Sequence, residues 1–519
     1  MKSNLICMLI TIIVYLVVMV VIGILASKKN KDTHDFYLGG RKLGPIVTAM
    51  SAEASDMSSY LLMGLPGLAL LTGLADVGWT VIGLAIGTYL NWLIVAKRLR
   101  LYSQKNNSIT IPEFFSNRYH DKHNILMGIS ALIILIFFIP YTASGFSACG
   151  KLFNTLFGMD YHAAMILSAV IIIAYTSIGG FLAASTTDLL QSIIMSAALV
   201  MIVIFATISA GGIGAVIENA KSLPGYLSLN HTYDITANSS KPYNIITIIS
   251  TVAWGLGYFG MPHILLRFMA IEDSNKIKTS RRIASIWVVI SMFIAILIGL
   301  IGKKMIVDGN ISVFGSNPSN FSAESETVIM KIATLISEHG IVAALCAGLV
   351  FAGILACTMS TSDSQLLAAS SSMSENILQG VFKIKMSPKV SMLTARGVLL
   401  IIAALSIVIA WNPESSVFHI VSFAWAGFGA TFGPVMLCAL LWKRSNKWGA
   451  IFGMITGGAM VFIWKFCVRP LGGKWDIYEL LPGFIAALIV IIVVSLLTKA
   501  PDKEIVNEFE EVQNELKNT

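Results

Sequence analysis

The stretch from Ser51 to Gly67, SAEASDMSSYLLMGLPG, decides the fold. It lies in an apolar segment long enough to cross a membrane, yet it contains two carboxylates, Glu53 and Asp56, and a proline near two glycines. A carboxylate at the centre of a bilayer costs about 2.5–3.5 kcal/mol on insertion scales, so it persists where it faces a wet cavity or a cation. Glycine and proline allow a helix to interrupt its hydrogen-bond ladder. The stretch therefore predicts a broken membrane helix that binds an ion and a solute. A polar contact between two helices is the alternative.

The composition is that of an all-α, polytopic membrane protein. Charged residues make up 12% of the 519 residues, whereas a soluble domain carries about 25%. The apolar runs predict about 13 transmembrane helices in one bundle. The net charge of +8 does not require a nucleic-acid partner, because the basic residues gather in short connections, as the positive-inside rule expects. Residues of this kind are Lys28, Lys29, Lys31, Arg41, Lys97, Arg98, Arg267 and Arg281. Their alternation predicts a multi-pass plasma-membrane protein with its N-terminus outside and its C-terminus in the cytoplasm.

A second interrupted segment, WGLGYFGMPH from Trp254 to His263, follows the first after five helices. Two broken segments at matching places in two halves are the sequence sign of an inverted-repeat transporter. We therefore divide the chain into a peripheral helix with its cytoplasmic connection (1–45), a first repeat of helices 2–6 (46–215), a second repeat of helices 7–11 (216–442), and peripheral helices 12–13 with a cytoplasmic tail (443–519).

Oxygen-bearing side chains gather on the predicted ninth helix. Ser360, Asp363 and Ser364 share one face, Cys357 lies one turn earlier, and Thr361 is adjacent. Hydroxyls and a carboxylate on one face suit a hard cation, which prefers oxygen ligands. The alternative is that the hydroxyls bond back to carbonyls of their own helix. With the carboxylate in the cluster, we favour the ion.

Three aromatic residues, Tyr141, Trp254 and Tyr258, occur beside or near glycines in aliphatic runs. They predict the wall of a small-solute pocket, with structural packing as the alternative.

Asp188 follows a Ser-Thr-Thr run after Gly179 and Gly180, which predicts that a sixth helix begins near Asp188 and that the acid caps it. We find no phosphate-binding Walker motif, and we expect a transporter rather than an enzyme.

Several motifs in order resemble the sodium/solute symporter family, most closely its bacterial sodium/proline symporter branch. They are SAEASDMSSYLLMGLPG, WGLGYFGMPHILLRFMA, MSTSDSQLL, FAWAGFGATFGPV, LGGRKLGP and GGFLAASTTD. The resemblance covers nearly the whole chain. It implies a LeuT-type core of 5+5 inverted repeats, in which helices 2 and 7 are broken and a central site is exposed to each side of the membrane in turn.

The resemblance also implies roles for individual residues. Sodium would be bound by main-chain oxygens of Ala54, Met57 and Cys357 and by side-chain oxygens of Ser360 and Thr361. The solute would contact Ser58, Tyr60, Tyr141, Trp254 and Tyr258. Arg41 would lie near the inner gate. The residues assigned to ion coupling or to a second cation are Glu53, Asp56, Asp188, Asp363 and Ser364.

Four positions depart from the branch: Glu53 and Ser59 stand where its proline transporters have glycine, Tyr60 where they have tryptophan, and Cys357 where alanine is common. Glu53 shares a helix face with Asp56, so its extra charge would bind a second cation, accept a proton or change the substrate. We expect sodium-coupled uptake of a small amino acid, first of all L-proline. The alternatives are another small amino acid or an organic acid, or a membrane solute sensor that does not transport. The expected partners are the solute, co-transported Na+ and the lipid bilayer; we expect no nucleic acid, and no oligomer is required.

Overall fold

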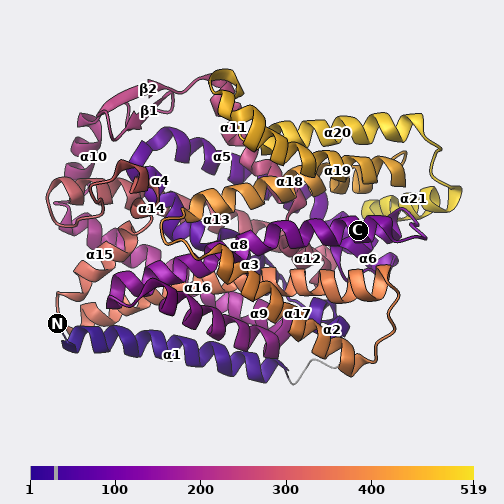
Figure 1. The fold of residues 1–519 in the computed structure, drawn as a ribbon, viewed down its shortest axis with the longest axis horizontal. Helices are drawn as coiled ribbons and strands as arrows, with labels where there is room; N and C mark the ends of the chain where they lie inside the picture. Colours follow the sequence, from indigo (N-terminus) through magenta and orange to yellow (C-terminus); the bar gives the residue numbers. More distant parts are fainter. Residues whose placement is uncertain (1, 28–32, 519) are drawn as a thin grey trace.

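The computed structural model describes residues 2–27 and 33–518, so Lys28, Lys29 and Lys31 lie outside the described residues. Its ribbon is a bundle of long helices that run roughly side by side (Figure 1). In order, the first helices are α1 (Lys2–Ser27), α2 (Thr33–Leu38), α3 (Pro45–Ser59), α4 (Leu65–Thr72), α5 (Leu74–Leu90), α6 (Lys97–Lys105), α7 (Ile111–Arg118), α8 (Ile125–Phe157), α9 (Tyr161–Ser209) and α10 (Ile213–Ser222).

A short antiparallel hairpin, β1 (His231–Asp234) and β2 (Ser239–Pro242), separates this half from the next. The remaining helices are α11 (Ile245–Val252), α12 (Pro262–Ala270), α13 (Ile277–Val307), α14 (Phe321–Ser325), α15 (Val328–Ser337), α16 (Ile341–Ser371), α17 (Pro388–Ile409), α18 (Val417–Leu441), α19 (Lys447–Ile463), α20 (Leu480–Leu497) and α21 (Lys503–Asn518). Helix α1 lies along one edge of the bundle, and α19 and α20 lie along the opposite edge, as the predicted peripheral helices would (Figure 1).

Helix α3 breaks at Ser58, as the opening stretch predicts. The backbone of Ser58 has φ 46° and ψ −169°, which no helical residue adopts. A π-helical turn from Tyr60 to Gly64 then leads into α4. The last four carbonyls of a helix have no N–H partner one turn ahead. The break therefore frees main-chain oxygens at the centre of the bundle, where they can bind a ligand.

The second predicted break is also confirmed. Between α11 and α12 the chain forms a 3-10 turn over Ala253–Gly260, and the two helices are bent by 47° at Met261. Glycine is required there, because a Cβ on Gly255 would lie 2.1 Å from the carbonyl oxygen of Gly83 in α5. The turn and α5 are therefore in direct backbone contact.

The predicted start of the sixth helix near Asp188 is wrong. Helix α9 is interrupted only at Gly180, with φ 64° and ψ −166°, and it is helical again from the next residue. The hydroxyls of Thr186 and Thr187 donate to carbonyls of their own helix, to Leu182 at 2.7 Å and to Ala183 at 3.1 Å, so the polar run stays helical. Asp188 lies two turns inside the helix and does not cap it.

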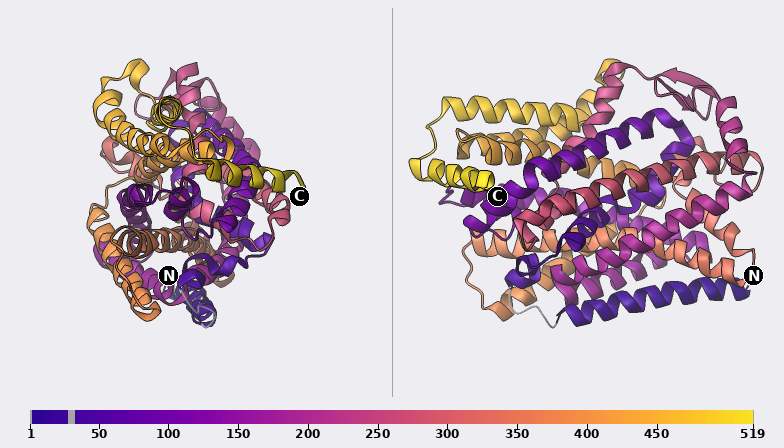
Figure 2. Two further views of the ribbon diagram at one scale, coloured as in Figure 1. Left: turned by 90° about the vertical axis from the view of Figure 1, so that its right-hand side faces the viewer. Right: turned by 180° about the vertical axis from the view of Figure 1, so that it is seen from behind.

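In the described part of the chain, ten helices are long and apolar enough to cross a membrane, or eleven when the bent pair α11–α12 is one span. Helix α9 has 49 residues, about twice the length of one crossing. The count of thirteen needs two crossings in α9 and one in α3–α4, and it stays a prediction. The start of α1 and the C-terminal helix α21 lie at opposite ends of the bundle (Figures 1 and 2).

Candidate functional site

The break in α3 lies against α16 through a set of buried oxygens. The hydroxyl of Ser360 donates to the carbonyl of Ala54 at 2.8 Å and to that of Cys357 at 3.2 Å. The hydroxyl of Thr361 also donates to the carbonyl of Cys357, at 3.2 Å, and the Cys357 thiol donates to the carbonyl of Ser58. Bonds back to the same helix are therefore present, but the Ser360 bond to Ala54 joins two helices. Carbonyl and hydroxyl oxygens of this kind are ligands for a hard cation.

Four of the five residues predicted to hold sodium thus meet at one place. The fifth, Met57, is on the same turn of α3. Its carbonyl accepts the N–H of Tyr60 within the chain, and its side chain lines the neighbouring pocket. The sequence therefore locates the oxygens well, while their binding of sodium stays a prediction.

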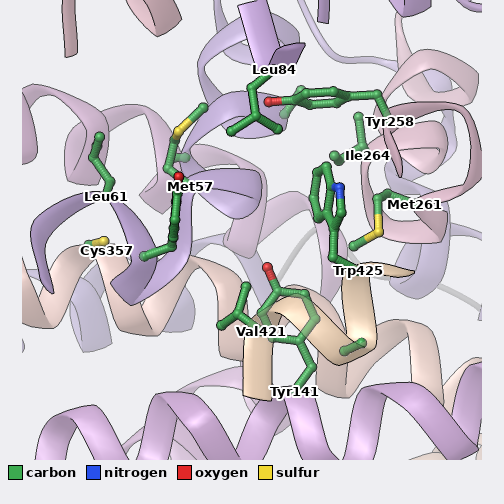
Figure 3. Packing of buried hydrophobic residues seen from close by; sticks show 14 of the residues in the cluster. Met57, Leu61, Leu84, Tyr141, Tyr258, Met261, Ile264, Cys357, Val421 and Trp425 are labelled. Atoms are coloured by element: carbon green, nitrogen blue, oxygen red, sulfur yellow. The ribbon is translucent and has the colours of Figure 1, made fainter. Parts of the chain in front are cut away.

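A small, tight pocket adjoins the break. Four residues predicted to contact the solute line it, namely Tyr60, Tyr141, Trp254 and Tyr258; Asp56, Met57, Leu84, Val421 and Trp425 complete the wall. Figure 3 shows the side chains of Met57, Tyr141, Tyr258 and Trp425 converging from separate segments. Ser58 does not line this pocket and contributes the backbone break instead.

Leu84 of α5 and Val421 and Trp425 of α18 also line the pocket wall and were not predicted from the sequence. The indole of Trp425 donates to the carbonyl of Trp254 at 2.8 Å, and a Cβ on Gly257 would meet that indole at 1.9 Å. Trp425 lies in the motif FAWAGFGATFGPV, so the sequence contained a signal that could have marked it as a site residue. Nothing in the local sequence around Leu84 or Val421 marks a binding residue.

The polar groups of the pocket are few. The hydroxyls of Tyr60 and Tyr141 are buried and have no hydrogen-bond partner among the described residues. The hydroxyl of Tyr258 donates to Asp56 at 2.5 Å. Small-molecule sites combine apolar walls with a few placed polar groups. Two unpartnered phenols and a carboxylate in an aromatic cavity suit a small zwitterion, whose carboxylate needs donors and whose amine needs an acceptor.

A stack of aromatic rings bounds the pocket on one side. The ring of Trp254 stacks on those of Tyr60, Phe418 and Tyr478, with centroids 5.9, 5.7 and 5.0 Å apart. The hydroxyl of Tyr478 donates to the carbonyl of Ser422 at 2.7 Å. The segment before α20 thus contributes to the neighbourhood of the pocket, which sequence order does not suggest.

Asp188, assigned to ion coupling, pairs with a buried arginine. Nη2 of Arg267 lies 3.2 Å from Asp188 Oδ2, and both side chains are almost fully buried. The hydroxyl of Ser51 donates to the same carboxylate oxygen at 2.6 Å, and Arg267 also donates to Ser51 at 3.0 Å and to Ser364 at 2.5 Å. This cluster joins α3, α9, α12 and α16. From the sequence, Arg267 was predicted only to be one of the basic residues in the short connections on the inner side, and not to pair with Asp188.

Asp363 and Ser364, two further members of that predicted set, are adjacent. Ser364 donates to Asp363 at 3.1 Å, and the hydroxyl of Tyr175 donates to the other oxygen of Asp363 at 2.7 Å. The structure therefore brings Asp188, Asp363 and Ser364 together, with the guanidinium of Arg267 as a positive charge among them. A sodium ion at these residues stays a prediction.

Arg41 forms hydrogen bonds with the ends of several segments. Its guanidinium donates to the side chain and the carbonyl of Ser103, each at 3.0 Å, and to the carbonyls of Ser108 and Met269, each at 2.7 Å. Next to it, the N–H of Leu43 donates to the carbonyl of Ala270 at 3.1 Å. These bonds connect the entry to α3 with α6 and α12. The role of Arg41 at the inner gate stays a prediction.

Comparison with known proteins agrees with this geometry. The profile described as "Sodium:solute symporter family" matches residues 36–457. The chain is 41% identical over 497 residues to the high-affinity proline transporter of Bacillus subtilis, covering 96% of this chain and 99% of that protein. It is 43% identical over 517 residues to a sodium/proline symporter of Haemophilus influenzae, covering 98% of both, and 41% identical over 508 residues to one of Escherichia coli, covering 97% and 96%.

Two solved structures share the fold. The outward-open, substrate-bound Na+-coupled sialic acid symporter matches with a TM-score of 0.77 at 18% identity, covering 96% of this chain and 98% of that one. A transporter of the nucleobase-cation-symport-1 family in a closed conformation matches with a TM-score of 0.53 at 14% identity, covering 93% and 99%. These likenesses establish the LeuT-type transporter fold. Together with the profile match and the full-length relatives, they show that this chain belongs to the sodium:solute symporter family.

Proposed function

We propose that this protein takes up L-proline into the cell together with sodium. The observation that carries the proposal is the bond between Ser360 and Ala54, which brings a main-chain oxygen of the broken α3 and a hydroxyl of α16 together beside the aromatic pocket. The full-length relatives that are named sodium/proline symporters support the choice of solute.

Sodium would bind between α3 and α16, with the carbonyls of Ala54, Met57 and Cys357 and the hydroxyls of Ser360 and Thr361 as ligands. Binding there would replace the hydrogen bond between Ser360 and Ala54 by two bonds to the ion and would hold the broken turn in place. Because Met57 and Tyr60 of that turn also line the pocket, the ion would raise the affinity for the solute. Such a coupling free energy acts in both directions.

The solute would lie in the pocket, with its carboxylate bound by the free hydroxyls of Tyr60 and Tyr141. Its pyrrolidine ring would pack on Trp254 and Trp425, which are both in the wall. Release on the inner side would require the bonds of Arg41 to break, because they join the segments that must separate.

We also propose the arrangement of the chain in the membrane. Residues 46–215 form a first repeat and 216–442 a second, and 1–45 and 443–519 are peripheral. The N-terminus lies outside and the C-terminus in the cytoplasm.

The membrane voltage can drive this uptake. One positive charge moving through 100 mV supplies about 2.3 kcal/mol. A hundredfold accumulation of solute requires about 2.8 kcal/mol. Voltage and a modest sodium gradient together suffice for one ion per solute.

The test is uptake of labelled proline by proteoliposomes with and without an inward sodium gradient, alongside a panel of other amino acids and organic acids. We expect proline to accumulate only with the gradient. Sodium-independent uptake would overturn the coupling. Sodium-driven uptake of another solute, without proline, would overturn the substrate. Binding without exchange in a counterflow assay would indicate a sensor.

A further inference from the structure

The C-terminal helix α21 packs across the end of the bundle at which Arg41 forms its bonds. The helix is amphipathic: Ile505, Phe509 and Val512 are buried at helical spacing, and most of its charged residues are exposed. It packs on α6, which carries the Ser103 acceptors of Arg41. Both helices lie at the same end of the bundle (Figure 1). Helix α21 therefore covers the segment that Arg41 binds.

The central contact of α21 is with a buried arginine, Arg118 of α7. The side chain is fully buried, and its guanidinium carbon lies 5.3, 5.1 and 5.2 Å from the ring centroids of Tyr102, Tyr119 and Phe509. Nε donates to the carbonyl of Ala439 in α18 at 2.8 Å, but Nη1 and Nη2 have no hydrogen-bond partner among the described residues. Phe509 is the wall of this aromatic cage that α21 supplies.

This cage limits how firmly α21 is attached. Aromatic rings attract a guanidinium, but two buried amino groups without acceptors cost free energy, because water would satisfy both. When Phe509 leaves, water reaches Arg118 and that cost is recovered. The docked and detached states of α21 therefore lie closer in free energy than the burial of its apolar face alone would place them.

Ion pairs hold α21 on its two sides. Lys105 at the end of α6 pairs with Glu511, and Lys443 just after α18 pairs with Glu510 at 3.0 Å. All four side chains reach solvent. Salt weakens such pairs, because the Debye length falls from about 10 Å at 0.1 M to about 3 Å at 1 M. The attachment of α21 is therefore sensitive to ionic strength.

Helix α21 joins two parts of the bundle. The side chain of Gln513 donates to the carbonyl of Leu440 at 3.1 Å, near the end of α18, the helix that also lines the pocket. On its other side α21 holds the α6–α7 hairpin, residues 97–118. The carbonyls of Ser103 and Ser108 in this hairpin accept from Arg41 at 3.0 and 2.7 Å. Docked α21 thus fixes the acceptors of Arg41 relative to α18.

The connection before α21 lets the helix leave without disturbing the bundle. Arg444 donates to the carbonyl of Thr498 at 2.9 Å, and Asn446 donates to the Thr498 hydroxyl at 2.7 Å and to the carbonyl of Lys499 at 2.8 Å. The chain is then not helical until α21 begins, and it contains Pro501. The bonds to Thr498 and Lys499 stay in place while α21 swings out about this connection.

We propose that α21 is a clasp that detaches when the ionic strength on its side of the membrane rises, and that its detachment speeds inward release of solute and sodium. This rests on the proposed function, in which the bonds of Arg41 break on the inner side. Docked α21 keeps the α6–α7 hairpin against α18 and so keeps Arg41 bonded. Once α21 is detached, the hairpin moves more freely and those bonds break more readily. The effector is dissolved salt, since any small ion screens the pairs.

The first test measures the initial rate of sodium-driven proline uptake by proteoliposomes that carry α21 inside, at fixed voltage and matched osmolarity. We expect the rate to rise by about threefold when N-methylglucamine chloride in the lumen is raised from about 0.1 M to 1 M. Phe509→Ala should be fast at low salt and should not respond further. The control Asp308→Asn, which breaks an exposed pair with Lys304 after α13, should keep the slow rate and the response. A rate that salt does not change, or a full salt response in Phe509→Ala, overturns the proposal.

The second test fixes the clasp in its docked state. Lys105→Cys with Glu511→Cys places two thiols at the position of one ion pair, where a short bis-maleimide joins them. We expect the joined protein to take up proline slowly at both salt concentrations, while the same reagent leaves the unaltered protein unchanged. A joined protein with the fast rate at high salt shows that α21 does not restrain release, and overturns the proposal.

The third test needs no solute. An isolated helix of about 16 residues is marginal in water, so the amides of detached α21 exchange hydrogen faster than those of docked α21. We expect exchange in α21 to rise between about 0.1 M and 1 M salt, and exchange in the control helix α10 to stay constant. Exchange in α21 that ignores salt overturns the clasp. The expected exchange in a protein that takes up another solute supports the clasp and overturns only the choice of proline.

Discussion

The hydroxyl of Ser360 in α16 donates a 2.8 Å hydrogen bond to the carbonyl of Ala54, the main-chain oxygen one turn before the break in α3. A helix carbonyl is normally bonded within its own helix, and this one is accessible to a side chain from another segment because Ser58 interrupts the ladder. The pair is the structural link between the sodium site that we propose and the pocket.

Ser360→Ala removes one of the proposed sodium ligands. Hydrogen-bonding groups that contact a charge contribute about 1.5–3 kcal/mol, so we expect the sodium concentration for half-maximal uptake to rise by about tenfold or more. The matched control is Ser370→Ala on the same helix, whose hydroxyl donates to the carbonyl of Ala395 away from the break. Equal sodium dependence in the two variants would argue against the site.

Asp56→Asn removes the carboxylate that lines the pocket, next in sequence to the proposed sodium ligand Met57. We expect a marked loss of apparent sodium affinity, because the negative charge that favours the cation is gone while the side-chain volume is kept. The control is Asp76→Asn in the first turn of α5, which lies outside the pocket. Titration of uptake with sodium measures the apparent sodium affinity of both variants. Unchanged sodium dependence in Asp56→Asn would refute its role.

Removing one partner of the buried pair of Asp188 and Arg267 leaves the other charge without its counter-ion. We expect Asp188→Asn to lower the free energy of unfolding by about 3–5 kcal/mol, measured as a lower unfolding temperature in detergent. Glu272→Gln, which breaks the exposed pair with Lys276, should leave the unfolding temperature nearly unchanged, because solvent screens an exposed ion pair. The double variant Asp188→Asn/Arg267→Gln should regain part of the loss. Similar stability of the buried and exposed variants would contradict this account.

Gly257→Ala would displace Trp425, a residue of the pocket wall. The added methyl group would meet the indole of Trp425 at 1.9 Å, so the indole must move. We expect the KM for the solute to rise by about tenfold, equivalent to about 1.4 kcal/mol. Gly397→Ala in α17, where no atom lies within 4 Å of the added carbon, should leave uptake as it is. A KM that is equal in both variants would show that Trp425 does not shape the pocket.

Local sequence was enough to predict features that depend on the backbone. The carboxylates, Gly64 and Pro66 predicted the broken α3, and the glycines after Trp254 predicted the second break. Hydroxyls on one face of α16 predicted the oxygens that meet Ala54, because helical spacing determines which residues share a face.

Features that depend on long-range packing were not predictable in this way. Asp188 was expected to cap a helix, since its local signals are those of a cap; its partner Arg267 is 79 residues away. Tyr478 reaches the aromatic stack from the segment before α20, and Trp92 is the only donor observed on Glu53 among the described residues. Such pairs are set by how helices pack, which periodicity does not encode.

The central claim is that an ion bound at the broken α3 raises the affinity of the neighbouring pocket for the solute. The most direct measurement is equilibrium binding of labelled proline to the purified protein over a range of sodium concentrations, together with the reverse titration. The account predicts that sodium lowers the Kd for proline and that proline lowers the Kd for sodium by the same factor. A Kd for proline that does not change with sodium would contradict it.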